Sequence, residues 1–282
     1  MAEGGFHHDV PEFLLRRFSH SSRDGLKVFA LSKSSKGISE IAIKRASGSI
    51  GGNVLHYVEG DHETSSNFLE DFFSNIENRS APITRMIGRE RGKKCLSGEE
   101  RHTIMAFIAM QYVRTPGFYQ KRSFNLELNI GDLELKDHGV DSASLDDMLH
   151  YLKKSGQIGE VFGISNALAK RELTAVLSGA NREFVLGDNP VVISRPTDQH
   201  YPINLRVFYE ISNPEAVIYL PISRAVALCL EPITGDLRSE RSVNIRYRLL
   251  DGKDVSEINK LQFSTAVDNV YGKTIGELVR LQ

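Results

Sequence analysis

Three short segments of the sequence carry residue types that could perform acid–base or phosphate chemistry. The first is the N-terminal run from His7 to Pro11, in which His8 offers an imidazole. Imidazole titrates near neutrality and can donate a proton, accept one or bind a metal. The apolar residues Phe13, Leu14 and Phe18 follow closely and are expected to fix the segment to a core. The plainer alternative is that a histidine here only caps the start of a helix.

The second segment, Gln111 to Pro116, closes a predicted amphipathic helix. Ser97 and Glu100 have the spacing of a capping box and predict the start of this helix. Pro116 predicts its end at Thr115, because proline disfavours the α conformation in the preceding residue. The apolar face of the helix is formed by residues at three- and four-residue spacing, namely Ile104, Phe107 and Ile108.

Gln111 and Arg114 are three residues apart, so they share one face of this helix, and it is the apolar face. A buried guanidinium must be paired. Its partner could be a ligand phosphate, the carbonyls of the helix or a carboxylate. The candidate carboxylates for a purely structural pair are Glu70, Glu77 and Asp188.

The third segment is Gly187-Asp188-Asn189-Pro190, which follows a predicted strand. Asp188 and Asn189 at a strand end could present oxygens as metal ligands, as a general base or as hydrogen-bond partners of a substrate. The plain alternative is a turn, because glycine, aspartate, asparagine and proline are the usual turn residues.

Other features carry less information. The basic cluster Arg85–Lys94 could contact phosphates or could be a solvated helix end. His56, Asp61, His62 and Glu63 match no metal-ligand spacing and are expected in a loop. The sequence holds no glycine-rich dinucleotide motif, P-loop, HExxH or GxSxG. The cofactor is therefore unknown, and a divalent metal held by Asp188 with Glu70 or Glu77 stays open.

Composition limits the partners. The 282 residues carry 35 basic and 36 acidic side chains, so the net charge is −1. Long-range attraction of a polyanion is therefore excluded, and any nucleic acid would be bound over a small footprint by locally concentrated cations. No apolar run reaches the roughly 18 residues of a membrane span, and residues 1–13 lack the pattern of a signal peptide. Cys95 and Cys229 have no CxxC spacing. We expect a cytoplasmic protein without a membrane partner.

The order of the predicted elements indicates an α+β fold. A helical middle would pack with a mixed or antiparallel sheet formed by N-terminal and C-terminal strands. We predict a single globular domain that is strand-rich at 1–60, helical at 66–180, strand-rich at 183–250 and closed by a helix at 254–271. Within these limits, 144–155 and 168–177 are expected to be helical, and 216–231 is expected to form a hairpin around Pro221 to Arg224.

The chain resembles the bacterial family with the domain of unknown function numbered 4238. The resemblance covers nearly the whole chain, and 117–165 is the least alike. Asp9 departs from the aromatic residue typical of the family, and Gly187 from its commoner serine. The resemblance implies that His8, Gln111, Arg114, Asp188 and Asn189 converge in one pocket. The matching segments are His8–Phe18, Leu69–Glu70, Ile76–Glu77, Ala109–Pro116, Phe184–Val191, Leu220–Ser223 and Ile258–Tyr271.

Two hypotheses follow for the function. In the first, the protein is a nuclease in a toxin or defence setting, with His8 as general acid or base within reach of Asp188 and with Arg114 stabilising charge on phosphate. Gln111 and Asn189 would then bind substrate. In the second, the same residues form a buried structural network in a ligand-sensing or protein-interaction module without catalysis. A small-molecule hydrolase or transferase using the same pocket is a third alternative.

Overall fold

The structure is a computed structural model, and its helices and sheets give the α+β fold that the sequence predicts. The residues that it describes are 6–8, 10–46, 48–50, 66–89, 94–115, 159–179, 181–194, 211, 213, 215–232 and 242–282. The predicted helix at 144–155 and the predicted loop around His56 and Glu63 lie outside the described residues.

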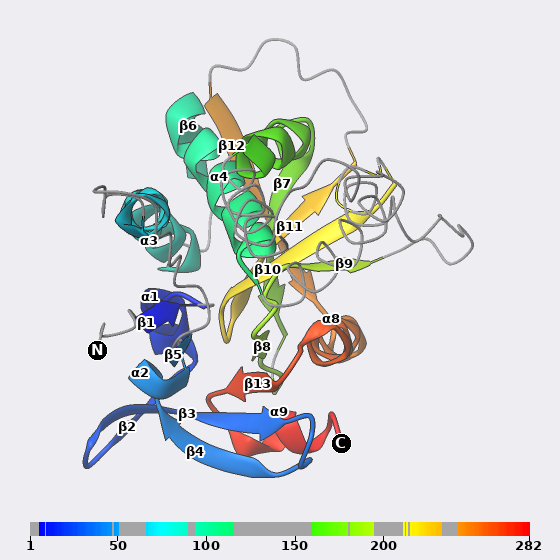
Figure 1. The fold of residues 1–282 in the computed structure, drawn as a ribbon. Coiled ribbons are helices and arrows are strands. Elements are labelled where there is room, and N and C mark those ends of the chain that lie inside the picture. The colour runs from blue at the N-terminus through cyan, green and yellow to red at the C-terminus, as the bar shows by residue number, and fades with distance from the viewer. Residues whose placement is uncertain are drawn as a thin grey trace, which may run out of the picture.

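The larger sheet has six strands and is mixed (Figure 1). Its one parallel pair joins β12 to β7, and its other neighbouring pairs are antiparallel. Its central strands are largely buried, which places the main core on this sheet. In spatial order the strands are β6 (Lys94–Ser97), β12 (Ser242–Leu250), β7 (Glu172–Ser178), β11 (Val226–Glu231), β10 (Val217–Ser223) and β9 (Val192–Ser194).

A second sheet combines strands from both ends of the chain, as predicted. Its path is β2 (His20–Ser22), β3 (Gly25–Ser32), β13 (Asn269–Gly272) and β8 (Leu186–Gly187), with β4 (Ile38–Ala42) paired to β3. A separate antiparallel pair joins β1 (Phe6–His8) to β5 (Gly48–Ile50). The chain passes from β8 to β9 between residues 187 and 192, so the predicted Gly-Asp-Asn-Pro turn connects the two larger sheets.

Two long helices form the predicted helical middle. Helix α3 (Ser66–Arg89) packs against α4 (Gly98–Val113), and a further helix occupies 159–168. The predicted capping box starts α4, because Ser97 Oγ accepts from the Glu100 N–H and the Glu100 carboxylate accepts from the Ser97 N–H. Helix α4 ends at Val113, two residues before the predicted end at Thr115.

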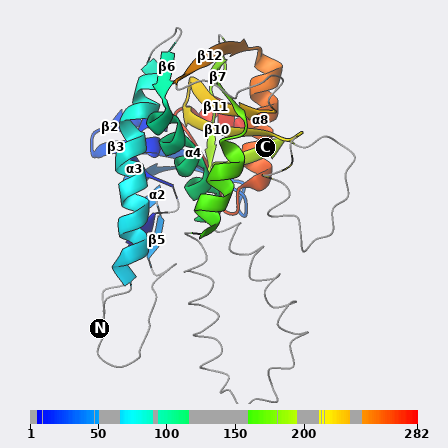
Figure 2. The same cartoon turned by 90° about the horizontal axis from the view of Figure 1, so that it is seen from above.

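Shorter helices complete the fold: α1 (Glu12–Leu15) with the 3-10 turn η1 (Arg16–Phe18), α2 (Ile43–Ala46), α8 (Gly252–Thr265) and α9 (Ile275–Val279). Both views place α3 on one side of the six-stranded sheet and α8 on the other (Figures 1 and 2). Among the described residues, no helix is long and apolar enough to span a membrane. Cys95 and Cys229 are both free thiols.

The structure corrects the predicted bounds of two helices, 168–177 and 254–271, and the predicted turn of the 216–231 hairpin. Residues 172–178 form strand β7 rather than helix, because a central strand buried on both faces is as continuously apolar as a buried helix. The terminal helix α8 ends at Thr265, and Asn269–Gly272 pairs with two strands instead. The hairpin between 216 and 231 exists, but β10 continues through Pro221 to Ser223 and the turn lies at residues 224–225.

Candidate functional site

The C-terminal end of α4 buries two of the predicted site residues. Gln111 is 0% exposed and Arg114 is 5% exposed, although both have polar heads. Gln111 and Arg114 are neighbours on the helix surface, as their spacing predicts. The predicted amphipathic pattern is wrong, however, because Met105, Ala109 and Met110 are also buried and α4 is covered on nearly every side. Burial at this position follows from the packing of α4 against α3 and the six-stranded sheet. The sequence therefore places a charged and an amide side chain where apolar residues would normally pack.

Arg114 is held by a carboxylate from the neighbouring helix. Its Nη1 donates to Glu77 Oε1 of α3, and the Glu77 side chain is 22% exposed. This is one of the three structural pairs that the sequence left open, whereas the Glu70 side chain lies outside the described residues. The ion pair holds the guanidinium in place. It also lowers the free-energy cost of burying the arginine, because the buried charge has a partner.

The surroundings of Gln111 differ from those of Arg114. Neither Oε1 nor Nε2 of Gln111 has a hydrogen-bond partner in the part of the chain that the structure describes. An amide buried without hydrogen bonds costs about 1–3 kcal/mol, and native proteins rarely leave both of its polar atoms in this state. A buried amide of this kind calls for an explanation, for which a water, an ion or a functional role are the usual candidates.

The N-terminal segment packs close to this end of α4. The rings of Phe13 and Phe107 are 5.5 Å apart, and Phe107 lies one helical turn before Gln111. Leu14 and Phe18 are fully buried, so the segment is fixed to the core as predicted. His8 lies in β1, where its backbone is opposite Gly48, and its imidazole lies outside the described side chains. The approach of His8 to Arg114 therefore stays a prediction.

Asp188 directly follows β8, and its carboxylate binds the backbone that leads from α8 into β13. Its Oδ1 accepts from the Val267 N–H at 2.7 Å, and its Oδ2 accepts from the N–H groups of Asp268 and Asn269 at 2.6 and 2.8 Å. Asp188 as a whole residue is 6% exposed. It thus satisfies three consecutive backbone donors between α8 and β13, which is a structural use of the side chain.

Burial dominates the electrostatics of Asp188. It raises the pKa of the carboxyl group above its ordinary value, and the nearby Asp268 charge adds to this. The three N–H donors favour the charged form and oppose the rise without cancelling it. Asn189 beside it donates from Nδ2 to the Thr265 carbonyl at 2.7 Å, which fixes the end of α8.

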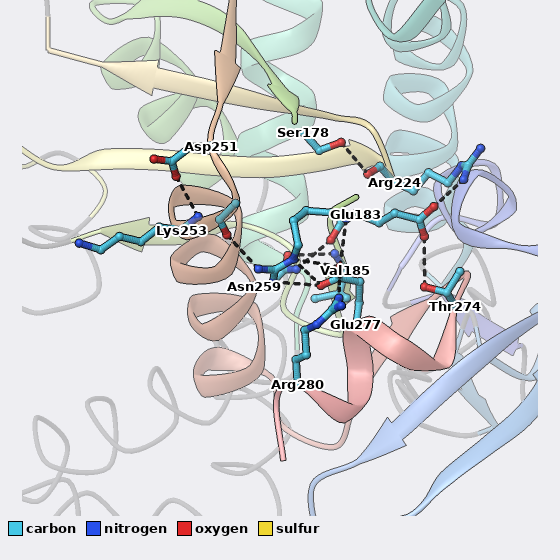
Figure 3. A network of polar contacts seen from close by, with 12 residues as sticks. Ser178, Glu183, Val185, Arg224, Asp251, Lys253, Asn259, Thr274, Glu277 and Arg280 are labelled. Carbon is cyan, nitrogen blue, oxygen red and sulfur yellow. Dashed lines mark hydrogen bonds and ion pairs between the residues drawn. The ribbon is translucent and has the colours of Figure 1, made fainter. Parts of the chain in front are cut away.

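Helix α8 presents two further amides to the same segment. Gln262 Oε1 accepts from the Gly187 N–H at 2.7 Å, and its Nε2 donates to the Pro190 carbonyl at 2.8 Å. Asn259 does the same with the Val185 N–H and the Glu183 carbonyl (Figure 3). These amides, which the sequence did not single out, pair with the backbone of 183–190. The sequence could have indicated them, because Asn259 and Gln262 are polar residues at positions of the predicted terminal helix that its spacing would bury.

Ion pairs between side chains of α9 and Arg182 also hold the 181–190 segment. Glu277 of α9 is 4% exposed and accepts from Arg182 Nε at 3.0 Å and from Arg280 Nη1 at 2.7 Å (Figure 3). Arg182 also donates to the Gly252 carbonyl. The polar groups around Asp188 thus belong to a satisfied framework that joins α8, α9 and the 181–190 segment.

Gln111 and Arg114 lie at the end of α4, and the side chains of Asp188 and Asn189 bind the backbone where α8 leads into β13. The convergence of these residues with His8 in one pocket stays a prediction. Among the described residues, no three histidine, cysteine, aspartate or glutamate side chains gather as metal ligands. Glu77 takes part in an ion pair with Arg114.

These features define an α+β protein with a polar site buried at a helix end. The family described as "Protein of unknown function (DUF4238)" matches residues 7–275, and the chain belongs to this family. No curated protein and no solved structure matches the chain.

Proposed function

We propose that the protein is a phosphodiester-cleaving enzyme, a nuclease, whose site is centred on the end of α4. The observation that supports this is the pair of buried side chains Gln111 and Arg114. Gln111 offers a donor and an acceptor that the described residues leave unused, and Arg114 supplies a fixed cation one turn away. A phosphodiester fits both, since its anionic oxygens attract guanidinium and accept amide N–H bonds.

The chemistry divides among three side chains. Arg114 stabilises the negative charge that grows on the phosphoryl oxygens as the nucleophile attacks. Gln111 positions the phosphodiester through its amide. His8 removes the proton from the attacking hydroxyl or returns one to the leaving oxygen, because imidazole titrates near neutrality. Glu77 orients Arg114 through their ion pair.

Asp188 and Asn189 have a smaller place in this proposal. The carboxylate of Asp188 already accepts three backbone N–H groups, and Asn189 is bound to the end of α8. We therefore assign both to the framework of the fold, and the reach from His8 to Asp188 stays a prediction on which the proposal does not depend. A divalent metal at the site is tested with a chelator.

A non-catalytic ligand-sensing or interaction module is the second candidate. A purely structural network would satisfy every buried polar group, and the Asp188 region does so. Within the described residues Gln111 has no such partner, and this supports a ligand at the end of α4 in either case. Turnover separates the two candidates.

The experiment compares cleavage by wild type, Gln111→Leu, Arg114→Ala and His8→Ala on a panel of RNA and DNA substrates, with and without a chelator. We expect cleavage by the wild type and at least a hundredfold loss in each variant, in line with roughly 10²–10⁴-fold effects of acid–base and charge-stabilising groups. Circular dichroism confirms that each variant is folded.

The results separate the alternatives. Cleavage that is retained in Gln111→Leu and Arg114→Ala would contradict the proposed site. A wild type that binds oligonucleotides but cleaves none of them would favour the sensing module. A wild type that hydrolyses only small phosphoesters would favour the small-molecule hydrolase.

A further inference from the structure

Two arginines on the last turns of α3 have no anionic partner in the described structure. Arg85 and Arg89 are one helical turn apart and both are exposed. No described carboxylate forms an ion pair with either, and no described carbonyl accepts from them. Two like charges at this spacing destabilise a helix by a few tenths of a kcal/mol, so the fold itself gains nothing from the pair.

A third arginine lies beneath the same stretch of α3. Arg17 of η1 donates from Nη1 to the Thr84 carbonyl at 2.9 Å and from Nη2 to the Ala81 carbonyl at 3.3 Å. A β-carbon placed on Gly88 would be 3.6 Å from Arg17 Nη1, so this guanidinium lies against the turn between Arg85 and Arg89. Burial and then the charges of Arg85 and Arg89 lower the pKa of Arg17 to about 10, and it stays charged at neutral pH.

Most other arginines in the described ranges are neutralised by a neighbouring carboxylate. Arg17, Arg85 and Arg89, which we call the arginine strip, depart from this arrangement together at one place. The neutralised pairs are Arg16–Glu12, Arg79–Glu99, Arg114–Glu77, Arg182–Glu277, Arg224–Glu183, Arg246–Glu172, Arg248–Glu231 and Arg280–Glu277.

We propose that the arginine strip binds the sugar–phosphate backbone of a nucleic acid whose scissile bond occupies the site at the end of α4. This inference rests on the proposed function and adds the surface that holds the polynucleotide beyond its scissile bond. Guanidinium groups suit this task, since their planar donors match phosphate oxygens in pairs. Arg17 donates to backbone carbonyls of α3. The exposed guanidinium groups of Arg85 and Arg89 donate to no described residue and can donate to phosphate oxygens.

Helix α3 links the strip to the site, because its Glu77 binds Arg114 at the end of α4. Glu77, which holds Arg114, precedes Arg85 by eight residues and Arg89 by twelve. At a rise of 1.5 Å per residue these separations are about 12 and 18 Å along α3. About four to five nucleotides of one strand cover this length at roughly 3.4 Å each. The footprint is short, which agrees with the small number of cations that a nearly neutral chain can concentrate.

The surroundings of the strip favour nucleic acid over a lipid surface. A membrane-binding surface adds exposed apolar side chains to its basic ones. In the described part of the chain the large exposed apolar side chains lie on elements other than α3 and η1. They are Leu26, Phe162, Leu249, Ile275 and Val279.

The test measures binding of a labelled single-stranded oligonucleotide of mixed sequence by fluorescence anisotropy at several salt concentrations. Arg85→Gln/Arg89→Gln removes the two exposed cations of the strip. Arg23→Gln/Lys253→Gln is the matched control, because it removes the same charge from exposed positions on other elements. Hydrolysis of a small chromogenic phosphodiester, which is too short to reach the strip, is measured on the same samples.

We expect the strip variant to bind roughly tenfold or more weakly at about 0.1 M salt. The slope of log affinity against log salt should fall by about 1.4, at roughly 0.7 for each single-strand phosphate that the variant no longer neutralises. The control should match the wild type, and hydrolysis of the small phosphodiester should not change.

Three outcomes would overturn the strip. The first is that the strip variant binds the oligonucleotide with wild-type affinity. The second is that the strip and control variants lose affinity equally. The third is that the protein binds phosphatidylserine vesicles through the strip but binds no oligonucleotide. Failure of the proposed function is a separate result. In that case the wild type cleaves nothing, while its oligonucleotide binding still depends on Arg85 and Arg89.

Discussion

Two glutamines are fully buried on two helices, and their surroundings differ completely. Gln262 of α8 uses both ends of its amide, for the Gly187 N–H and the Pro190 carbonyl. Gln111 of α4 uses neither end within the described residues. The same side chain at the same burial is thus explained by the fold in one case and not in the other. The comparison teaches that burial of a polar residue indicates function only when its hydrogen bonds are unaccounted for.

The contrast extends to the charged residues of each region. Around Gln262, Asp188 satisfies three backbone donors and Glu277 binds two arginines. Around Gln111, Arg114 is bound by a carboxylate that is itself partly exposed. The α8 region is therefore a closed framework, whereas the described part of the α4 region leaves one buried amide without hydrogen bonds.

The largest effect is expected from Asp188→Ala. It would leave three partly buried N–H groups at 267–269 without their acceptor. Hydrogen bonds to a charged group contribute about 1.5–3 kcal/mol each, and partial exposure places these at the lower end, so the free energy of unfolding should fall by about 4 kcal/mol. Urea denaturation measures this. Wild-type stability in the variant would show that the framework does not depend on this carboxylate and would return Asp188 to the candidates for catalysis.

The next largest effect is expected from Gln262→Leu. Leucine has a similar volume, but the Gly187 N–H and the Pro190 carbonyl would lose their partners, so the free energy of unfolding should fall by about 3 kcal/mol. A melting temperature within a degree of the wild type would remove the basis of the comparison.

Glu77→Ala should have an intermediate effect. It removes the carboxylate that binds the buried guanidinium of Arg114. Loss of one partner of a fully buried ion pair costs about 3–5 kcal/mol, and the partial exposure of Glu77 reduces this to about 2 kcal/mol. Thermal melting at low and high salt measures the loss. No change at either salt concentration would show that the ion pair does not position Arg114.

A smaller effect is expected from pH. Burial raises the pKa of Asp188 in the folded state, so the folded protein binds more protons than the unfolded chain between the two pKa values. The stability that Asp188 contributes is then fully present below the unfolded value of about 3.9 and is lost as the pH rises through the folded value. Urea titrations at steps from pH 4 to pH 7 should show a decline that is absent in Asp188→Asn. A rise over this range that is specific to the wild type would contradict the direction of the shift.

The sequence predicted local features better than long-range ones. The capping box at Ser97 and Glu100 was confirmed, because it depends on residues within one helical turn, and Gln111 and Arg114 are buried as predicted. The role of Asp188 depends on backbone donors about 80 residues away, and no local pattern reports such a contact. The strand β7 was mistaken for helix for the related reason that its neighbours in the sheet, not its own residues, decide its conformation.

The lack of described hydrogen-bond partners around the Gln111 amide could not be predicted either, because it depends on all the residues that surround the side chain. The buried spacing of Asn259 and Gln262 was visible in the sequence, but whether their amides find partners was not. Sequence reasoning thus reaches the residue types of the site, and the distinction between a framework residue and a candidate ligand residue requires the three-dimensional contacts.

The smallest effect on stability is expected from Gln111→Leu, and it decides the comparison. If the fold uses neither end of this amide, leucine removes a buried polar group that has no hydrogen bonds and keeps the volume. The free energy of unfolding should then stay within about 1 kcal/mol of the wild type or rise, while Gln262→Leu loses about 3 kcal/mol. Both are measured by urea denaturation in the same buffer. An equal loss in the two variants would show that Gln111 has a structural partner after all, and the site at the end of α4 would lose its main support.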